Sequence, residues 1–522
     1  MIREISRRKC LRLWLCKPEY MERTKWENRF VLLRFWKKNY MMFLKDLKRF
    51  KMERLYDKLK AYSESDFYAF HMPGHKRNKA LLGIELPYDL DITEIDGFDD
   101  LHHADGILKE EQERAARVFG AEESHFLVNG STAGILSAVM GCTHRGDKIL
   151  VARHCHKSIY HAIYMNGLVP RYVYPEFDIS MHMNGEISKE DVAKALAAEP
   201  DIKAVVIVSP NYDGVVSDVK GIAEVAHSYR IPLIVDEAHG PHFGFHPAFP
   251  GRANDLGADV VINSLHKTLP SLTQTAILHI NGKLANRRRI KKYLDMLQSS
   301  SPSYIFMASL DACVDFLDGK CEEAFELYVE RLQKFREELK PLQHLQILRT
   351  EHYDISKVVI STANANITSP ELAERLRKEY HLEMEMTGGT YVLAMTTVAD
   401  TQEGLNRLKA ALLEIDDQLE AKTAVSGSIE ISGELPRLEQ YFTPQEAADR
   451  EEDGEAEEIP WKESEGHISL EYAYLYPPGS PVIVPGERIS REAVELLCYY
   501  ETQNLQIEGI QTEGKIKVWK HE

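Results

Sequence analysis

The stretch LIVDEAHG (233–240) is the most informative part of the sequence, because a run of apolar residues ends directly in an acidic residue, Asp236. A second apolar run, ADVVINS (258–264), leads in the same way into NSLHKT (263–268) and its lysine, Lys267. Short continuous runs of β-branched residues bounded by turn residues are typical of strands covered on both faces. The two runs therefore predict buried strands with polar side chains at their carboxyl ends, where ligands of open α/β sheets bind.

The same pattern continues on both sides of these two strands. The runs DKILVAR (147–153), KAVVIVSP (203–210) and AILHING (276–282) also read as short buried strands, and helical segments such as GIAEVAHSYR (221–230) separate them. Strands that alternate with helices favour a doubly wound α/β fold. We therefore expect residues 105–321 to form a large domain around a mostly parallel sheet.

The rest of the chain divides into smaller parts. Residues 52–104 precede the large domain as an N-terminal segment, and residues 322–425 show the helix and strand pattern of a small α/β domain. Residues 426–522 are interpreted as an acidic linker followed by a compact C-terminal domain. The linker is placed at EEDGEAEE (451–458), because runs of like charge usually stay solvated.

The first fifty residues differ from the rest in charge. They carry 15 Lys and Arg against 5 Asp and Glu, together with Trp14, Trp26 and Trp36. A basic, aromatic segment can serve as a surface-binding arm. The alternative, which we favour, is that residues 1–51 are an extension upstream of a natural start near Met52.

The overall composition is that of a globular protein. The 522 residues are 44% hydrophobic and 28% charged, and the formal net charge of −17 argues against nucleic acid or an anionic membrane as a main partner. No apolar run approaches the ~18 residues of a membrane helix. Seven scattered cysteines without a C-x-x-C pair fit a reducing compartment and argue against structural zinc. We expect a cytoplasmic protein.

Two motifs supply groups that suit a phosphate. NGSTAG (129–134) lies between a predicted strand and a predicted helix, so its backbone N–H groups and the hydroxyls of Ser131 and Thr132 can bind an anion. Ser264 and His266 flank Lys267 and can add two more donors. A Gly/Ser turn can also be only a turn, and Asp236 can be only a helix cap.

Lys267 is harder to explain structurally, because burying an ammonium group is costly. Desolvation lowers the pKa of such a lysine and makes it a nucleophile for Schiff-base chemistry. Upstream, RHCHKSIYH (153–161) supplies His154, His156 and His161. A metal site would need further ligands at suitable spacing, so we favour an imidazole that stacks on an aromatic ligand.

A phosphate cradle, a stacking imidazole, a carboxylate and a lysine on one α/β sheet are the groups that pyridoxal phosphate requires. With these residues the chain resembles the Orn/Lys/Arg decarboxylase family, which are fold type I pyridoxal-phosphate enzymes, and in particular its shorter bacterial members. The resemblance runs from about Met52 to the C-terminus. It rests on FHMPGHKRN (70–78), DITEIDGFDDLHHADGILKEEQ (91–112), NGSTAG (129–134), HCHKS (154–158), SPNYDG (209–214), DEAHGPHFGF (236–245), SLHKTLPSLTQTA (264–276) and YPPGSPVIVPGE (476–487).

The resemblance implies a role for each motif residue. Lys267 would form the Schiff base with the cofactor, and Asp236 would pair with the pyridine nitrogen. His156 would stack on the ring, Ala238 would lie behind it, and His239 would lie near the ring oxygen or the substrate. The phosphate would be held by Ser131, Thr132, Ser264 and His266.

The implied function is α-decarboxylation of a basic amino acid, with arginine favoured over lysine and ornithine, feeding polyamine synthesis. Another pyridoxal-phosphate activity on the same scaffold, such as that of an aminotransferase or aldolase, and a non-catalytic regulatory paralogue remain alternatives. Such enzymes form active sites between two large domains, so the resemblance implies a homodimer or a multiple of dimers.

The residues that recognise the distal cation of the substrate are less well marked. Five acids in DITEIDGFDD (91–100) are our first candidates, and Glu471 and Glu487 are our second. A solvated acidic loop is the structural alternative. Asn211 in SPNYDG (209–214) departs from the Thr or Tyr of related chains, which leaves the substrate contacts at that point open.

Overall fold

The computed structural model places most of the chain as one compact unit, Leu55–Glu522. The predicted extension 1–51 lies outside the described residues. Among the residues that the structure describes, no helix has both the length and the apolar character to cross a membrane. These residues are 54–178, 183–421, 434–475, 479–502, 505 and 507–520.

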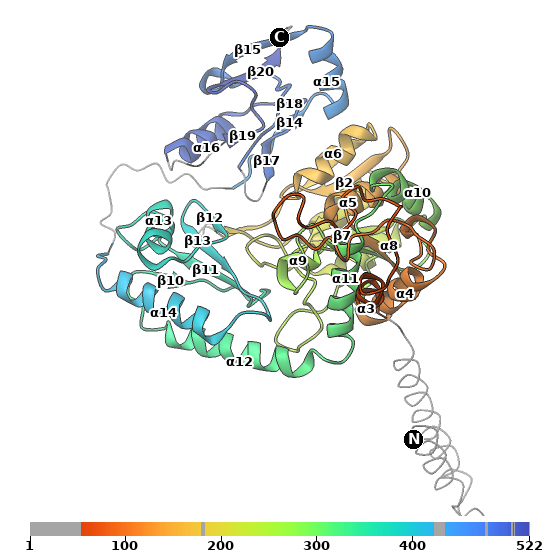
Figure 1. The fold of residues 1–522 in the computed structure, drawn as a ribbon. Helices are drawn as coiled ribbons and strands as arrows, with labels where there is room; N and C mark the ends of the chain where they lie inside the picture. The colour runs from red at the N-terminus through yellow and green to blue at the C-terminus, as the bar shows by residue number, and fades with distance from the viewer. Residues whose placement is uncertain are drawn as a thin grey trace, which may run out of the picture. The chain divides into compact units, whose positions relative to one another are not determined.

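A seven-stranded sheet in the order β1-β9-β8-β7-β6-β2-β3 lies in the stretch predicted as the large domain (Figure 1). The five strands from β8 to β3 pair in parallel, whereas β9 pairs antiparallel with both β8 and β1. The prediction of an α/β fold with a mostly parallel sheet is confirmed. The strands are β1 (Glu123–Leu127), β2 (Lys148–Ala152), β3 (Val169–Val173), β6 (Val205–Val208), β7 (Leu233–Asp236), β8 (Val260–Asn263) and β9 (Ala276–Ile280).

The edge strand β3 is an element that the sequence pattern did not reveal. Its sequence, VPRYV, contains Pro170, which lacks a backbone N–H and is tolerated in sheets mainly at edges. β3 pairs only on its β2 side within the described sheet. A proline that argues against a central strand is therefore compatible with this position.

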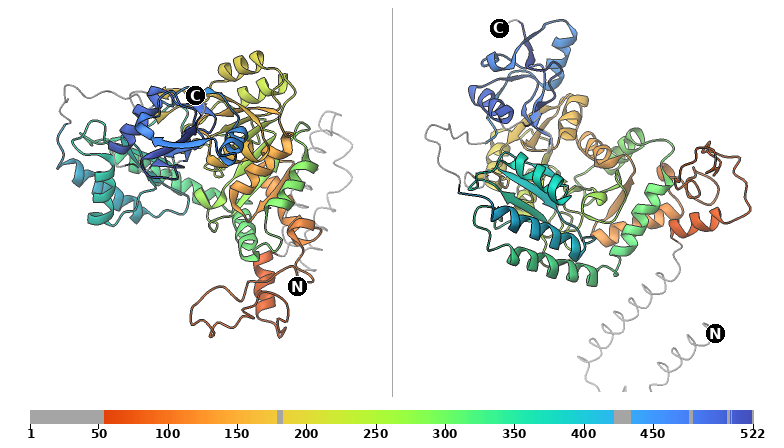
Figure 2. Two further views of the ribbon diagram at one scale, coloured as in Figure 1. Left: turned by 90° about the horizontal axis from the view of Figure 1, so that it is seen from above. Right: turned by 60° about the vertical axis from the view of Figure 1, so that its left-hand side comes forward.

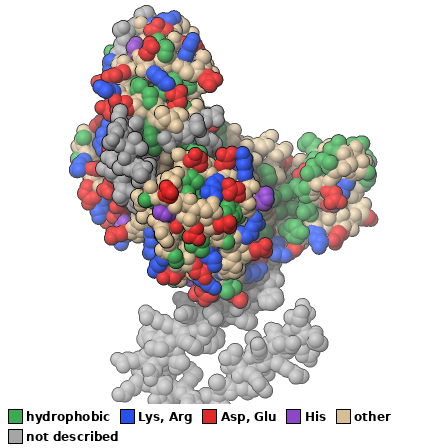
Figure 3. Space-filling model, turned by 90° about the vertical axis from the view of Figure 1, so that its left-hand side faces the viewer, with side chains coloured by type: hydrophobic (Ala, Val, Ile, Leu, Met, Phe, Trp, Pro, Cys, Tyr) green, Lys and Arg blue, Asp and Glu red, His purple; other side chains and the backbone are tan. Residues whose placement is uncertain are grey.

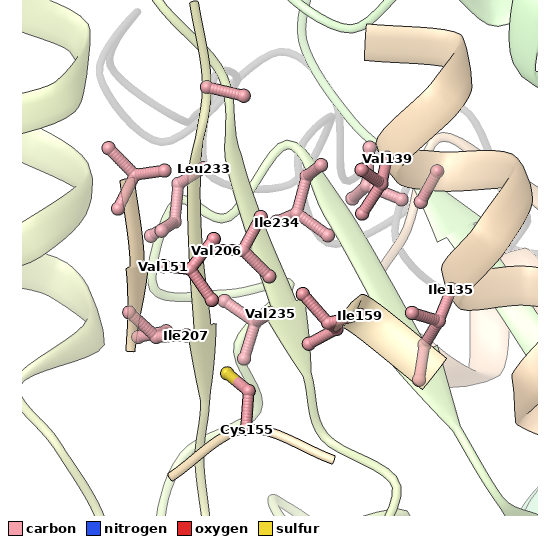
Figure 4. Packing of buried hydrophobic residues seen from close by; sticks show 14 of the residues in the cluster. Ile135, Val139, Val151, Cys155, Ile159, Val206, Ile207, Leu233, Ile234 and Val235 are labelled. Atoms are coloured by element: carbon pink, nitrogen blue, oxygen red, sulfur yellow. The ribbon is translucent and has the colours of Figure 1, made fainter. Parts of the chain in front are cut away.

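Helices cover the sheet, and the main hydrophobic core lies between the helices and the strands. β6, β7 and β8 are buried at every position, as expected for strands covered on both faces. Side chains from β2, β6 and β7 pack against α5 and α6 in the core shown in Figure 4. The helices of this domain are α4 (Ile107–Phe119), α5 (Gly130–Cys142), α6 (Lys157–Met165), α7 (Lys189–Ala198), α8 (Val219–Ser228), α9 (Leu265–Thr268), α10 (Arg287–Leu297) and α11 (Tyr304–Leu317).

An antiparallel sheet in the order β10-β11-β13-β12 lies in the stretch predicted as the small domain. α13 packs against this sheet and against α14, and α14 packs in turn against α12 (Figure 2). The elements are α12 (Glu322–Glu338), β10 (Gln346–Ile347), β11 (Lys357–Ser361), α13 (Ser369–Tyr380), β12 (Met386–Thr387), β13 (Tyr391–Met395) and α14 (Gln402–Asp416).

The acidic stretch 451–458 is part of the folded C-terminal region, so its interpretation as a linker was wrong. It spans the end of α15 (Pro444–Glu452) and the start of β15 (Ala456–Pro460), which pairs antiparallel with β20 (Lys515–Trp519). Lys517 of β20 lies opposite Glu458 and donates to Glu451 at 2.5 Å. Countercharges that are distant in sequence thus allow the acidic run to fold.

The other C-terminal strands form two small sheets, and α16 packs against β19. β14 pairs with β18, and β16 pairs with both β17 and β19. The elements are β14 (Glu439–Gln440), β16 (Ala473–Leu475), β17 (Ser480–Ile483), β18 (Glu487–Arg488), α16 (Arg491–Thr502) and β19 (Ile507–Glu508).

A cluster of exposed apolar side chains marks the N-terminal segment, which begins with α3 (Leu55–Ser63). Figure 3 shows hydrophobic side chains gathered on one side of the surface. Contiguous exposed apolar patches often mark interaction sites, whereas single exposed apolar residues are ordinary. Those exposed between residues 67 and 86 are Phe67, Tyr68, Phe70, Met72, Leu81, Leu82, Ile84 and Leu86.

A buried ion pair connects the C-terminal region to the large domain. Arg153, which directly follows β2, donates to the two carboxylate oxygens of Glu487 at 2.7 and 2.8 Å and to the carbonyl of Val482 at 2.9 Å. Both charged side chains are fully buried. Ser480 also donates to the carbonyl of His154 at 2.8 Å. The backbone that leads to His156 is therefore held by the C-terminal region.

Replacing Glu487 by leucine should destabilise the protein strongly. The change leaves the Arg153 charge buried without its partner, and removing one member of a buried pair costs about 3–5 kcal/mol. Urea denaturation followed by tryptophan fluorescence measures the loss. The double variant Arg153→Met/Glu487→Leu should recover most of it. An unchanged midpoint in Glu487→Leu would contradict the structural role of the pair.

Candidate active site

A cavity of about 490 Å³ lies at the carboxyl ends of the central parallel strands. Its wall brings together every residue that the sequence analysis assigned to the cofactor, although they come from four separate stretches of chain. The predicted residues on the wall are Ser131, Thr132, His156, Asp236, Ala238, His239, Ser264, His266 and Lys267.

Asp236 is the last residue of β7 and is almost fully buried. One carboxylate oxygen accepts the backbone N–H of Ala238 at 3.2 Å. Burial raises the pKa of Asp236, and the charge of Lys267 opposes this effect. A buried carboxylate with lone pairs to spare can accept a hydrogen bond from a cationic ring nitrogen, which would stabilise its charged form.

Lys267 lies in α9, just beyond the end of β8, and its amine contacts an imidazole. The distance from Lys267 Nζ to His239 Nε2 is 2.8 Å. Burial lowers the pKa of Lys267, although Asp236 and Glu385 favour its charged form. Burial, followed by the charges of Lys267 and Lys357, also lowers the pKa of His239 well below its usual value. The site therefore favours an uncharged imidazole beside a reactive amine.

The start of α5 and the loop after β8 together present hydrogen-bond donors suited to an anion. The first N–H groups of a helix lack intrahelical partners, and no side chain among the described residues caps α5. Asn129, which precedes the helix, instead accepts the N–H of Ser299 at 3.2 Å. Ser131 Oγ, in the first turn, lies 2.5 Å from Ser264 Oγ. Backbone donors and two hydroxyls thus meet at one point, as a phosphate requires.

His266 also borders this surface, in a defined tautomer. Its Nδ1–H donates to the carbonyl of Thr275 at 2.9 Å. Its Nε2 can then donate only when the ring is protonated, and burial lowers the pKa of the ring. A nearby phosphate charge would counteract this shift. At Nε2, His266 could therefore donate to a phosphate only in its charged form.

His156 is the N-cap residue of α6 and lies on the cavity wall. Its Nδ1 accepts the backbone N–H of Ser158 at 3.2 Å and lies 2.8 Å from the Ser158 hydroxyl, which places the ring proton on Nε2. Burial and the charge of Lys267 lower the pKa of His156 to about 4. A neutral, oriented imidazole is well suited to stack on an aromatic ring.

The structure adds residues that the sequence analysis did not select. Asp213 and Glu385 line the cavity, and Tyr212 donates a hydrogen bond to Glu385. Tyr391 donates to Asp213, and burial raises the pKa of Asp213 to about 6. Lys357, the first residue of β11, lies 3.3 Å from His239 Nδ1. These residues were missed because no local motif links 212–213 to strands of the small domain.

Asn211 holds the backbone of the turn that follows β6. This role was not predicted from the sequence. Its Oδ1 accepts the N–H groups of Gly214 at 3.0 Å and Val215 at 2.9 Å, and its Nδ2 donates to the carbonyl of Asn184 at 2.8 Å. Asn211 also lines the cavity. The asparagine therefore shapes the turn as well as facing the site.

The acids proposed for the distal cation lie elsewhere. Within the described part of the chain, the cavity wall includes none of the five acids of 91–100, nor Glu471, nor Glu487. Asp99 accepts the N–H groups of Gly106 and Leu108, both at 2.9 Å, and Glu471 accepts that of Lys517 at 2.9 Å. Glu487 is already paired in the core. The prediction that Glu471 or Glu487 receives the distal cation of the substrate was therefore wrong.

No group of three or more His, Cys, Asp or Glu residues able to hold a metal ion occurs among the described residues. His154 and His156 both line the cavity, whereas His161 does not belong to its wall. The three histidines of 153–161 therefore do not converge on one point of this cavity.

Sequence comparisons identify the class of protein to which this fold and site correspond. The family model described as Orn/Lys/Arg decarboxylase, major domain, matches residues 53–366, and that of the C-terminal domain matches residues 433–514. The chain belongs to the Orn/Lys/Arg decarboxylase family.

Individual relatives agree with this assignment. The chain is 33% identical to the arginine decarboxylase of Bacillus subtilis over 471 residues, covering 87% of this chain and 95% of that protein. It is 32% identical to the arginine decarboxylase of Bacillus anthracis over 487 residues, covering 89% and 97%.

Solved structures of lysine decarboxylases share the fold. The Francisella novicida enzyme LdcF superposes with a TM-score of 0.77 at 20% identity, covering 92% of this chain and 83% of that one. The constitutive lysine decarboxylase of Escherichia coli gives a TM-score of 0.76 at 21% identity, covering 95% and 84%.

Replacing Glu237 by glutamine should remove a pH dependence of stability. Burial raises the pKa of Glu237 to about 8, although Asn263 and the N–H of Ala253 donate to it. Because the folded protein binds this proton more tightly than the unfolded chain, stability is greatest below pH ~4.5 for this group and falls as the pH rises toward 8.

Glu237→Gln mimics the protonated form, so its free energy of unfolding should exceed that of the parent by a few kcal/mol at pH 8.5. Thermal melts between pH 5 and 9 measure the difference. Parallel pH profiles for the two proteins would contradict the assigned protonation.

Proposed function

We propose that this chain is a pyridoxal-phosphate-dependent decarboxylase of a basic amino acid, with arginine as the favoured substrate. The observation that carries the proposal is the presence of Asp236, Lys267 and an uncapped helix start on one cavity. Membership in the Orn/Lys/Arg decarboxylase family supports the reaction class. Relatives named arginine decarboxylase, matched over 95% or more of their length, support the substrate.

The residues fit the proposed cofactor at each of its chemical features. The N–H groups at the start of α5, with the hydroxyls of Ser131 and Ser264, match a phosphate. Asp236 offers a buried carboxylate to the ring nitrogen, and Lys267 offers an amine to the aldehyde. Pyridoxal phosphate, when bound, supplies a ring that accepts the electron pair released when a Cα substituent departs.

The surrounding side chains control orientation and protons. His156 presents a neutral ring held by Ser158. Ala238, with its small side chain, leaves space on the cavity wall. Lys267 and His156 are the two groups proposed to return a proton to Cα after carbon dioxide has left, because both line the cavity and carry a proton on a side-chain nitrogen in one of their forms.

Glu385 is proposed to receive the distal cation of the substrate. Of the three acids on the described wall, Asp213 is bonded by Tyr391 and Asp236 is assigned to the ring nitrogen. Glu385 also lines the cavity, and it retains acceptor capacity beyond its bond from Tyr212. A guanidinium or ammonium group at this point would gain a charge-assisted hydrogen bond.

We also propose a homodimer, or a multiple of dimers, in the cytoplasm, with the amine product available for polyamine synthesis. The apolar cluster of residues 67–86 supports burial of that segment against another chain.

Purified protein supplied with pyridoxal phosphate should bind it through Lys267 and release carbon dioxide from basic amino acids. Borohydride reduction followed by peptide mapping should find the cofactor on Lys267. Carbon dioxide should be released fastest from arginine in a panel with lysine and ornithine. Lys267→Ala should abolish turnover, and Asp236→Asn should reduce it at least ~100-fold without unfolding the chain.

Three outcomes of this experiment would contradict the proposal. A keto acid in place of carbon dioxide would indicate an aminotransferase. Bound cofactor without turnover of any substrate would indicate a regulatory paralogue. Absence of cofactor binding would reject the site assignment itself.

Glu385→Gln should lower kcat/KM for arginine and lysine by ~10–150-fold, because a hydrogen bond to a charged group contributes about 1.5–3 kcal/mol. Turnover of norleucine, which lacks the distal cation, should be unaffected. Glu383→Gln is the matched control, since Glu383 is exposed and lies outside the cavity wall. An equal effect on cationic and neutral substrates would exclude Glu385 as the recognition residue.

A further inference from the structure

Two lysines flank the two ring nitrogens of His239. Lys267 Nζ lies 2.8 Å from Nε2, and Lys357 Nζ lies 3.3 Å from Nδ1. Lys357 is fully buried and does not line the cavity, so it contacts His239 from the protein interior and not from the cavity. The sequence motifs give this lysine no role, and the proposed decarboxylation does not use it.

A neutral imidazole carries one N–H and one lone pair. The nitrogen with the lone pair can accept from either form of a lysine amine. The nitrogen with the proton can form a hydrogen bond only to an amine that has lost its own proton, because an ammonium group has no lone pair. If His239 is neutral and both contacts are hydrogen bonds, one of the two lysines must therefore be uncharged.

The acids around the site decide which lysine keeps the charge. Those that face Lys357 are Asp354, Asp213 and Glu385, whereas Lys267 faces Asp236 and Glu385. Burial lowers the pKa of Lys357 to about 8, so this amine remains mostly protonated at neutral pH. The other titratable rings that face His239 are His156 and His266.

Asp354 is the strongest of these countercharges. It accepts from Ser356 N and Oγ at 2.9 and 2.7 Å, and it lies 3.1 Å from His242 Nε2. Burial opposes its ionisation, but His242 and these hydrogen bonds leave the pKa of Asp354 below its usual value. The charge of an ionised Asp354 carboxylate favours the protonated form of Lys357.

We propose that Lys357 is a positioning residue, which fixes His239 in the tautomer protonated at Nε2 so that the imidazole donates to an uncharged Lys267. The Lys357 ammonium donates to Nδ1, and the Nε2–H donates to the lone pair of Lys267. The free amine of Lys267 is thereby held in its nucleophilic form. The catalytic value of this arrangement rests on the proposed function, whereas the tautomer does not.

The test measures the protonation of Lys267 in the full-length chain freed of cofactor. A small acetylating reagent is applied across a pH series, and mass spectrometry follows acetylation of Lys267 relative to exposed lysines. Lys357→Met removes both the positive charge and the donor to Nδ1. His239 can then turn its lone pair at Nε2 toward Lys267 and stabilise the ammonium, so both effects raise the pKa of Lys267.

We expect the midpoint of acetylation to rise by at least one pH unit in Lys357→Met, which is about a tenfold slower reaction at a fixed pH below the midpoint. Lys357→Arg keeps a cation and a donor, so its midpoint should stay near that of the parent. Lys357→Gln removes the charge, and it should raise the midpoint if the methionine variant does not fold.

Val359→Ala is the matched control for lost packing. Val359 is buried on β11 two residues from Lys357 and therefore on the same face of the strand. It should lower the melting temperature without moving the midpoint. An unchanged or lowered midpoint in the neutral Lys357 variants, or an equal shift in Val359→Ala, would overturn the proposal. Because no turnover is measured, this result is independent of whether the chain proves to be a decarboxylase.

Discussion

The parallel pairing of β7 with β8 is the constraint on which the site depends. The two strands align Ile234 with Val260 and Asp236 with Ile262, and every position in both is buried. A charged group inside such a strand would be buried without a partner. The first polar side chains therefore occur where the strands end, at one edge of the sheet. A carboxylate and an amine meet there because the core excludes them from other positions.

The N-terminal end of α5 adds backbone donors to the side chains that lie at the strand ends. α5 follows β1 after a short turn, so its uncapped first turn faces the same edge of the sheet as Asp236 and Lys267. Oriented backbone N–H groups favour an anion without requiring a buried lysine or arginine at that point. The amine of Lys267 therefore remains available for chemistry, because the backbone offers the donors for the phosphate of the proposed cofactor.

Much of this arrangement could be predicted from the sequence, because local patterns encode it. Continuous apolar runs predicted β2, β6, β7, β8 and β9. The polar residues at the ends of those runs predicted much of the cavity wall. The edge strand β3 was missed because Pro170 in its sequence argues against a strand. The acidic stretch 451–458 was misread because its countercharges come from β20, more than fifty residues later.

Interactions between distant segments could not be predicted in the same way. Glu487 reads as a free acid in the sequence, and only the fold pairs it with Arg153 across 334 residues. Lys357 reads as the polar first residue of a strand. Its burial depends on the position of β11 beside the turn that follows β6. No local motif distinguishes such residues from ordinary surface charges.

That turn explains how Lys357 reaches His239. Gly214 has a φ of +103°, and a Cβ added there would lie 2.7 Å from Lys357 Cγ. A side chain at this position would thus displace the lysine stem, and the backbone conformation would be strained as well. Asn211 holds the turn in place through its bonds to Gly214 and Val215. The asparagine and glycine of SPNYDG therefore leave room for the buried lysine of β11. This requirement links the motif to the protonation that we propose for Lys267.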